Sequence, residues 1–367
     1  MSKQQLELKA IQEAIAKDDA GWEAGITPVS ELTPAEKEKM LGYIPGPDDP
    51  SLEEMVAQGK AALQAYQSMA FAASSAAPAS LDWRNNNGNF VTPVKNQGSC
   101  GSCVAFGTIA SVEAQVKIQR GAGYAVDLSE AQLFYCHARS EGRNCGNGWW
   151  PDKAMKAFQD KGVTREQSYP YTAGDQNCSG LASDYANYLT KIAGYSKISG
   201  IQAIKEYIAT KGPVEACFTV YQDFYNYQSG IYKHTTGSVV GGHCVCIVGY
   251  NSAQSYWICK NSWGTGFGES GYFRIKFGDC GIEGQVYGPT AIINNDQLNG
   301  VKITGLWANG ENRNAWAYVS GYGWRKITTK SDQAFLTMLT QLASAKVTGT
   351  NCNLTISNGQ ISKLYVF

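Results

Sequence analysis

The sequence predicts an α+β protein whose central part places a helical half before a half made of strands. Residues 103–120 carry the apolar pattern of a long helix. Short runs rich in β-branched and aromatic residues come later, at residues 214–220, 244–250, 256–260 and 272–277. Because the helices precede the strands instead of alternating with them, we expect two packed lobes, one helical and one built from strands.

The segment before this central part, residues 1–78, is expected to hold two helices. A loop rich in proline and glycine, residues 42–47, is followed by a helical pattern over residues 52–70. Residues 70–80 are mostly small and include a proline, which is the composition of a linker. The helix before the loop is marked by apolar residues near helical spacing: Leu6, Leu8, Ile11 and Ile15.

The last part of the chain, residues 296–367, is expected to form a small separate domain of strands and one helix, following a central domain of residues 79–292. Strands are predicted near Val301 and over residues 315–319, and Ser331 can cap the helix. Asn358-Gly359 predicts a hairpin turn. Either core packing or a binding face for carbohydrate or protein explains the crowded aromatic residues, and ring exposure decides between them: Trp307, Trp316, Tyr318, Tyr322 and Trp324.

Charge and hydropathy exclude several classes of function. The 367 residues include 31 Lys plus Arg and 31 Asp plus Glu, so there is no net field to attract nucleic acid or an anionic membrane. No apolar run is long enough for a membrane helix. The N-terminus has no apolar stretch typical of a signal peptide, so we expect either that a leader was removed or that export uses another route.

Cys103, His243 and Asn261 have the chemistry and the order of a thiol protease site. A thiol becomes a useful nucleophile as a thiolate, which a helix N-terminus and a neighbouring imidazole favour. Cys103 follows a glycine-rich turn and opens the predicted helix. His243 lies 140 residues later (243 − 103), and Asn261 follows after 18 more (261 − 243). We expect His243 at the start of one strand and Asn261 at the end of the next.

Residues 93–103, with the sequence PVKNQGSCGSC, resemble the active-site segment of the papain family. The resemblance extends over about residues 81–290 and implies a papain-like two-lobed fold with a β-barrel-like lobe. It also implies that Gln97 donates to the oxyanion together with the Cys103 backbone N–H, and that Trp263 shields the Asn261–His243 hydrogen bond. Val104 stands where the family usually has tryptophan, which leaves the packing there open.

Within the family the chain looks most like a precursor of the cathepsin B type. Residues 22–25 and 42–47 resemble its short propeptide, which implies a segment laid through the cleft opposite to substrate. The long insertion with paired histidines is missing between Cys145 and Cys178, which implies endopeptidase activity instead of dipeptide release. The second half matches at residues 212–215, 221–224, 241–243 and 280–283.

The eleven cysteines favour an oxidising compartment without proving one. The resemblance implies two disulfides in the helical lobe, Cys100–Cys145 and Cys136–Cys178. Cys244-x-Cys246 is closer than usual zinc-ligand spacing, so we expect no metal. His137 and His234 receive no role. Six cysteines have no partner assigned from the sequence: Cys217, Cys244, Cys246, Cys259, Cys280 and Cys352.

The same resemblance implies, by position, which residues form the pocket for the second substrate residue before the cut. Gln285 stands where cathepsin B has a glutamate that accepts arginine, so we expect Leu, Val or Phe to be preferred over Arg. The sequence leaves open whether Cys217 and Cys244 bond to each other. The other expected substrate contacts are Gly148, Trp149, Trp150, Gly242 and Trp263.

Together these features predict a cysteine endopeptidase precursor that acts through a thioester acyl-enzyme and needs no cofactor. We expect peptide and protein substrates, inhibition by its own propeptide, a monomer, no nucleic acid partner, no membrane span, and a secreted or lysosome- or vacuole-like location. Two alternatives remain: an inactive papain-like binding protein, and a peptide ligase or acyltransferase on the same site.

Overall fold

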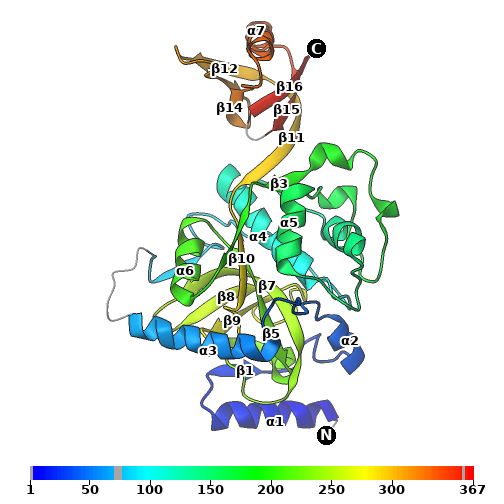
Figure 1. The fold of residues 1–367 in the computed structure, drawn as a ribbon, viewed down its shortest axis with the longest axis vertical. Coiled ribbons are helices and arrows are strands. Elements are labelled where there is room, and N and C mark those ends of the chain that lie inside the picture. Colours follow the sequence, from blue (N-terminus) through cyan, green and yellow to red (C-terminus); the bar gives the residue numbers. More distant parts are fainter. Residues whose placement is uncertain (1–2, 70–76, 358–359) are drawn as a thin grey trace.

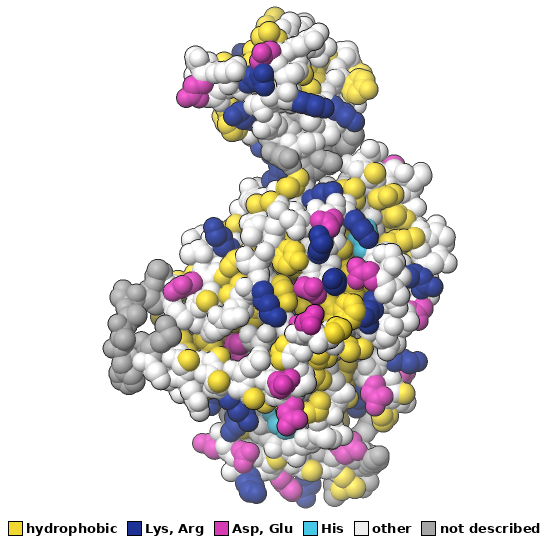
Figure 2. Space-filling view, in the orientation of Figure 1, with side chains coloured by type: hydrophobic (Ala, Val, Ile, Leu, Met, Phe, Trp, Pro, Cys, Tyr) yellow, Lys and Arg dark blue, Asp and Glu magenta, His cyan; other side chains and the backbone are white. Residues whose placement is uncertain are grey.

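A computed structural model describes residues 3–69, 77–357 and 360–367. Three parts follow one another along the chain (Figure 1), with the N-terminal helix and the C-terminal domain at opposite ends of the molecule. Acidic and basic side chains are interspersed over the face shown in Figure 2, as their equal numbers predict. Within the described ranges, no helix combines the length and apolarity needed to cross a bilayer.

The N-terminal segment holds both predicted helices and wraps around the strand-rich lobe. A short helix and a strand, which the sequence pattern did not reveal, lie between them. Thr33 caps the short helix through a reciprocal pair of hydrogen bonds with Glu36. The strand is held by pairing with residues more than 200 positions away, which is why local pattern missed it. The elements are α1 (Lys3–Lys17), β1 (Trp22–Ala24), α2 (Pro34–Lys39) and α3 (Leu52–Met69).

The helical lobe is built around the predicted helix, α4 (Cys103–Arg120). Its first 14 residues, Cys103 to Val116, are all buried, because α4 packs against α5 on one side and against β5 and β7 of the other lobe on another. A helix that lies between two layers is expected to be buried on all sides. The lobe is completed by the helical turn η1 (Gln132–Ala138) and by α5 (Pro151–Asp160).

The strand-rich lobe is one long sheet that also recruits β1. Its order is β1-β6-β9-β8-β7-β5-β10-β4, with β2 paired to β7, and α3 and α6 pack against it. The sequence placed His243 at the start of a strand, but the strand begins four residues earlier, so that His243 lies inside it. The elements are β2 (Ser80–Asp82), β4 (Tyr195–Ile198), α6 (Ile201–Thr210), β5 (Val214–Tyr221), β6 (Tyr227–Tyr232), β7 (Val239–Asn251), β8 (Tyr256–Lys260), β9 (Tyr272–Lys276) and β10 (Gln285–Pro289).

The C-terminal part forms a second sheet with its own core, in the order β12-β13-β14-β16-β15-β11-β3. Strand β11 pairs with β3 at its start and with β15 further along, so a single strand joins the two parts (Figure 1). Ser331 caps α7 as predicted. The predicted turn Asn358-Gly359 lies outside the described residues. The elements are β3 (Thr190–Ile192), β11 (Ile292–Val301), β12 (Ile303–Ala308), β13 (Ala315–Val319), β14 (Gly323–Ile327), α7 (Asp332–Thr348), β15 (Cys352–Ser357) and β16 (Gln360–Val366).

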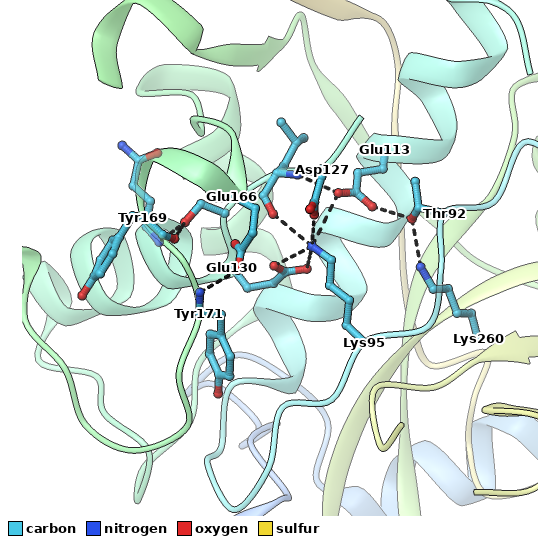
Figure 3. A network of polar contacts seen from close by, with 12 residues as sticks. Thr92, Lys95, Glu113, Asp127, Glu130, Glu166, Tyr169, Tyr171 and Lys260 are labelled. Carbon is cyan, nitrogen blue, oxygen red and sulfur yellow. Dashed lines mark hydrogen bonds and ion pairs between the residues drawn. The ribbon is translucent and has the colours of Figure 1, made fainter. Parts of the chain in front are cut away.

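A network of ion pairs and hydrogen bonds around Lys95 includes Glu113 in the middle of α4 and ties the two lobes together (Figure 3). The Lys95 ammonium lies 2.6 Å from Asp127 and 2.8 Å from Glu130, and 3.8 Å from Glu113. Lys260 on β8 joins the network by donating to the Thr92 hydroxyl at 3.0 Å. Burial raises the pKa of the Glu130 carboxyl above its ordinary value, while Lys95 opposes that rise. Lys95 therefore compensates several carboxyl groups.

Replacing Lys95 with alanine is expected to destabilise the fold by about 3–5 kcal/mol, because it leaves buried carboxyl groups without their cation. Chemical denaturation of the Lys95→Ala protein measures this. Lys9→Ala is the matched control, since Lys9 makes an exposed pair with Glu13 at 3.6 Å, worth less than about 1 kcal/mol. Equal effects of the two substitutions would contradict the assigned role of Lys95.

Candidate active site

Cys103 begins α4 and is fully buried beneath the N-terminal segment. Its Sγ accepts a hydrogen bond from the backbone N–H of Gly42 at 3.3 Å and another from the N–H of Cys244 at 3.4 Å. Burial raises the pKa of this thiol to about 11, and the two N–H donors only partly oppose that rise. Burial in this closed state therefore disfavours the thiolate form of Cys103.

His243 and Asn261 meet although they belong to different strands. The Nε2–H of His243 donates to Asn261 Oδ1 at 2.8 Å, and the same oxygen accepts the Ser262 N–H at 2.8 Å. That second bond fixes the amide orientation, so Nδ1 of His243 is left as the basic nitrogen, and it makes no hydrogen bond among the described residues. The Trp263 ring lies 4.6 Å from the imidazole and is itself buried.

Gln97 lies buried beside the Cys103 turn, with its amide group held at both ends. Its Nε2–H₂ donates to the carbonyl oxygens of Met40 at 2.9 Å and Cys100 at 2.7 Å. Its Oε1 accepts the Ser262 hydroxyl at 2.6 Å. The sequence did not indicate Ser262 as a positioning residue, although its place between Asn261 and Trp263 was a usable signal. A carbonyl of the N-terminal segment thus occupies the donor expected to serve an oxyanion.

The N-terminal segment crosses the site as extended backbone. Tyr43 N–H donates to Gly242 O at 3.1 Å, and Gly42 O accepts the Trp149 N–H at 2.8 Å. A Cβ added at Gly242 would fall 2.4 Å from Tyr43 O, and one at Gly148 would fall 2.0 Å from Gly42 O. Both glycines are therefore required for this close backbone approach.

Gln285 is buried and contacts the N-terminal segment at Asp49. Its amide donates to Asp49 at 2.9 Å, and the Tyr287 hydroxyl donates to its Oε1 at 3.1 Å. Tyr287 was not anticipated, although it lies two residues along the same strand and therefore on the same face. Cys217 and Cys244, directly opposite on β5 and β7, are joined by a disulfide.

The two tryptophans of the expected pocket behave differently. The indole N–H of Trp149 donates to Glu141 at 3.0 Å, and its backbone N–H donates to the Gly42 carbonyl of the N-terminal segment. Trp150 is half-buried and lies beside Gly46, with the Arg143 guanidinium 3.5 Å from its ring centre. The turn before them runs Cys-Gly-Asn-Gly, and this altered order is the feature that made their side chains hard to place from sequence.

The remaining cysteines and histidines have structural surroundings. Cys100–Cys145 and Cys136–Cys178 are bonded in the structure, whereas five cysteines are free, Cys103 among them. Because Cys244 is bonded to Cys217, its sulfur is not available as a thiolate ligand beside Cys246. His137 contacts the carbonyl of Gly162 and His234 pairs with Asp223.

Similarity to known proteins agrees with this geometry. A family model described as papain family cysteine protease matches residues 77–290. The chain belongs to the papain family of cysteine proteases. It is similar to cathepsin B-like CP3 of Giardia intestinalis, with 38% identity over 226 residues that cover 58% of this chain and 74% of the relative.

Solved structures of proforms resemble this protease. Digestive procathepsin L2 from the larval midgut of Tenebrio molitor aligns with a TM-score of 0.63 and 32% identity, over 78% of this chain and 90% of its own. Procathepsin B S9 from Trypanosoma congolense shares the fold, with a TM-score of 0.62 and 22% identity over 79% of this chain and 98% of its own. These alignments cover a larger share of the protease than residues 77–290, so the likeness extends beyond the family domain.

Proposed function

We propose that this papain-family protease is the precursor of a cysteine endopeptidase with Cys103 as nucleophile, His243 as base and Asn261 as the residue that orients His243. The observation that carries the proposal is the path of the N-terminal segment. Gly42 N–H meets the thiol, and Met40 O meets the Gln97 amide. The backbone of the N-terminal segment therefore already contacts the thiol and the amide that a substrate would need.

The geometry assigns each residue a step once the segment has left. Nδ1 of His243, held by the Nε2–H bond to Asn261, takes the proton of the Cys103 thiol. The thiolate attacks the peptide carbonyl, and the oxyanion is stabilised by the Gln97 amide and the Cys103 N–H. The imidazolium then protonates the leaving amine. Water, deprotonated by His243, hydrolyses the thioester and frees Cys103.

Inhibition follows from the order in which the segment passes these groups. Met40 lies at the oxyanion donor, Gly42 at the thiol, Tyr43 beside Gly242, and Asp49 at Gln285.

The proposed domains are a propeptide of residues 1–78, a catalytic domain of residues 79–292 and an accessory domain of residues 296–367. We place processing between Tyr66 and Leu81. Part of that interval, residues 70–76, lies outside the described residues.

Acidification is expected to loosen the closed state through His243. Burial lowers the pKa of the His243 imidazole to about 4 from an ordinary value of 6.5, although the Asn261 bond opposes the shift. At pH values between these two, the imidazole is protonated when it is exposed to water and neutral when it is buried in the closed state. The stability of the closed state relative to the open state therefore falls by up to about 1.4 kcal/mol per pH unit as the pH falls. Self-processing should therefore accelerate as pH falls through this window.

Gel analysis of the precursor in reductant, over a series of pH values, measures this rate. His137→Gln is the matched control, since burial also lowers the pKa of His137 but its ring contacts Gly162 away from the segment. It should leave the pH profile unchanged. A processing rate that stays constant or rises with pH would refute the role of His243.

The pocket around Gln285 is expected to prefer apolar residues at the second position before the cut. The ring of Tyr43 lies in the same apolar cluster as Cys217, Cys244 and Tyr287, and its hydroxyl makes no hydrogen bond among the described residues. Burying a Leu or Phe there contributes about 1.5–3 kcal/mol, whereas Arg finds no carboxylate on Gln285. The kcat/KM for Leu should exceed that for Arg by about 10-fold or more.

Two variants of the processed enzyme sharpen this prediction. Gln285→Glu should raise the kcat/KM for Arg and lower that for Leu, because it places a carboxylate at this position of the pocket. Gln285→Leu, which removes the amide without adding charge, should leave Arg poorly cleaved. If the wild-type enzyme cleaves Arg as well as Leu, the pocket assignment is wrong.

We further propose a secreted or lysosome- or vacuole-like location for a monomeric enzyme, on the basis of the disulfides and the likeness to cathepsins.

One experiment tests the proposed function as a whole. The precursor is incubated at acidic pH with reductant, its new N-terminus is read, and peptides with blocked C-termini are offered. Hydrolysis of blocked peptides supports an endopeptidase, transfer to an added amine indicates a ligase, and no turnover indicates a binding protein.

A further inference from the structure

The C-terminal sheet closes into a small barrel whose topology matches a known ligand-binding fold. Strands β11 and β12 are separated only by Lys302, so the two ends of the order β12-β13-β14-β16-β15-β11 are consecutive stretches of one strand. Strands β14 and β16 are parallel and the other pairs in this circuit are antiparallel. Helix α7 connects β14 to β15. This is the strand order of an OB-fold, which binds oligosaccharides and oligonucleotides on the face of its second and third strands.

Aromatic side chains form a grid on that face. In one row Trp307 of β12 is opposite Trp316 of β13, which is opposite Lys326 of β14. In the next row Gly305 is opposite Tyr318, which is opposite Trp324. Side chains two residues apart on a strand share a face, so four rings lie together. We call this set, Gly305, Trp307, Trp316, Tyr318, Trp324 and Lys326, the aromatic platform.

The platform is exposed although it contains the largest side chains of the barrel. Trp307 is 48% exposed and Trp324 is 46% exposed, whereas Ala315 and Ala317 on the opposite face of β13 are fully buried. A strand selected for core packing would place its large rings inside and its small residues outside. The reversed pattern answers the question that the sequence left open: these rings do not serve the core.

The platform is shaped for stacking. Trp307, Trp316 and Trp324 line one shallow open hollow. A Cβ at Gly305 would lie 3.1 Å from the Trp324 ring, so the missing side chain makes room for that indole to lie over β12. Tyr318 holds Trp324 edge-on, with ring centres 5.4 Å apart. The three indole rings around one hollow offer apolar surface on which a ligand with a flat apolar face can stack.

The neighbouring polar groups favour a sugar over a nucleic acid. At one end of β13, Asn314 accepts the Trp316 indole N–H at 3.2 Å and donates to Glu311 at 2.6 Å. Amide and carboxylate groups beside stacked rings suit hydroxyl groups, whereas a carboxylate repels phosphate. Two cations lie at the platform, and both are engaged by its own residues: Lys326 lies 5.9 Å from the Trp316 ring centre, and Arg325 donates to the Trp324 carbonyl at 2.9 Å. Single-stranded nucleic acid requires a row of cations along its backbone.

We propose that the aromatic platform of the C-terminal barrel binds an uncharged oligosaccharide, with its sugar rings stacked on Trp307, Trp316 and Trp324. The catalytic domain cleaves peptide bonds and the barrel holds the enzyme at glycan-bearing material. The platform lies on a different part of the chain from the proposed active site, so binding does not depend on Cys103.

Titration calorimetry of the full-length Cys103→Ala protein tests this with cellohexaose, chitohexaose, maltohexaose and mannohexaose. At least one of these sugars should bind, with a Kd in the micromolar to millimolar range. Trp316→Ala should weaken that binding by about tenfold or more. Tyr365→Ala, which removes an exposed ring outside the platform, should leave it unchanged.

The same titration with a single-stranded oligothymidylate separates the alternatives. Binding of the oligothymidylate in preference to every sugar, lost in Trp316→Ala, would assign the platform to nucleic acid and overturn the proposal. Failure of all four sugars to bind would overturn it as well, as would sugar binding that Trp316→Ala leaves intact. Because the barrel has a core of its own, its folding is checked by hydrogen exchange of its backbone amides, which should be protected equally in the wild-type and Trp316→Ala proteins.

Discussion

Replacing Cys103 with alanine is expected to abolish peptide hydrolysis and leave the fold intact. The substitution removes one sulfur, whose hydrogen bonds are two weak ones from the N–H groups of Gly42 and Cys244. Without a thiolate there is no thioester intermediate, so kcat/KM should fall by at least about 10⁴-fold. Steady-state hydrolysis of a fluorogenic peptide measures the loss, and circular dichroism checks the fold.

Cys246→Ala is the matched control, because Cys246 is also a free, fully buried thiol on the strand that carries His243. Its burial raises its pKa to about 12 and no step of the mechanism uses it. This variant should keep most of its activity after processing. A folded Cys103→Ala protein that turns over near the wild-type rate would exclude Cys103 as nucleophile.

Release of the N-terminal segment is expected to raise activity by at least about 100-fold, because a tethered segment acts on the site at millimolar effective concentration. The clean comparison uses one folded precursor, carrying a site for a specific protease in the linker after α3, before and after cleavage and removal of the segment. A small peptide substrate measures the rate. Cutting a folded protein avoids asking whether residues 79–367 fold alone.

Tyr43→Ala provides a second reading of the same effect. The Tyr43 ring is buried in the cluster that includes Cys217, Cys244 and Tyr287, so its loss should weaken the hold of the segment and let the uncut precursor leak activity. Leu6→Ala, at a largely exposed position on α1, should not. An uncut wild-type precursor as active as the cleaved enzyme would refute inhibition by the segment.

The features that local sequence encodes were predictable. Helix α4 begins at Cys103 because a glycine-rich turn gives way to a continuous apolar run, and β8 ends just before Asn261. Spacing then indicated which histidine joins them. Two glycines precede His243 and hide the strand pattern, which is why the start of β7 at Val239 was placed too late.

The features that depend on register were not predictable. The Cys217–Cys244 disulfide exists because β5 and β7 place these residues directly opposite each other, and pairing register cannot be read from spacing. The ring of Trp149 turns toward Glu141 through a contact formed only in the folded lobe. Closure of the C-terminal barrel depends on β14 and β16 running parallel across a long connection, which local patterns do not encode.

Labelling by an epoxide thiol reagent, followed by mass spectrometry of the intact protein and its peptides, tests the central claim most directly. Cys103 is the proposed nucleophile, and Met40, Gly42 and Tyr43 cover its surroundings in the precursor. We therefore expect no labelling of the uncut precursor near neutral pH, and one label on Cys103 after the segment is removed. Labelling of the uncut precursor at the same rate, or of another cysteine instead of Cys103, would contradict it.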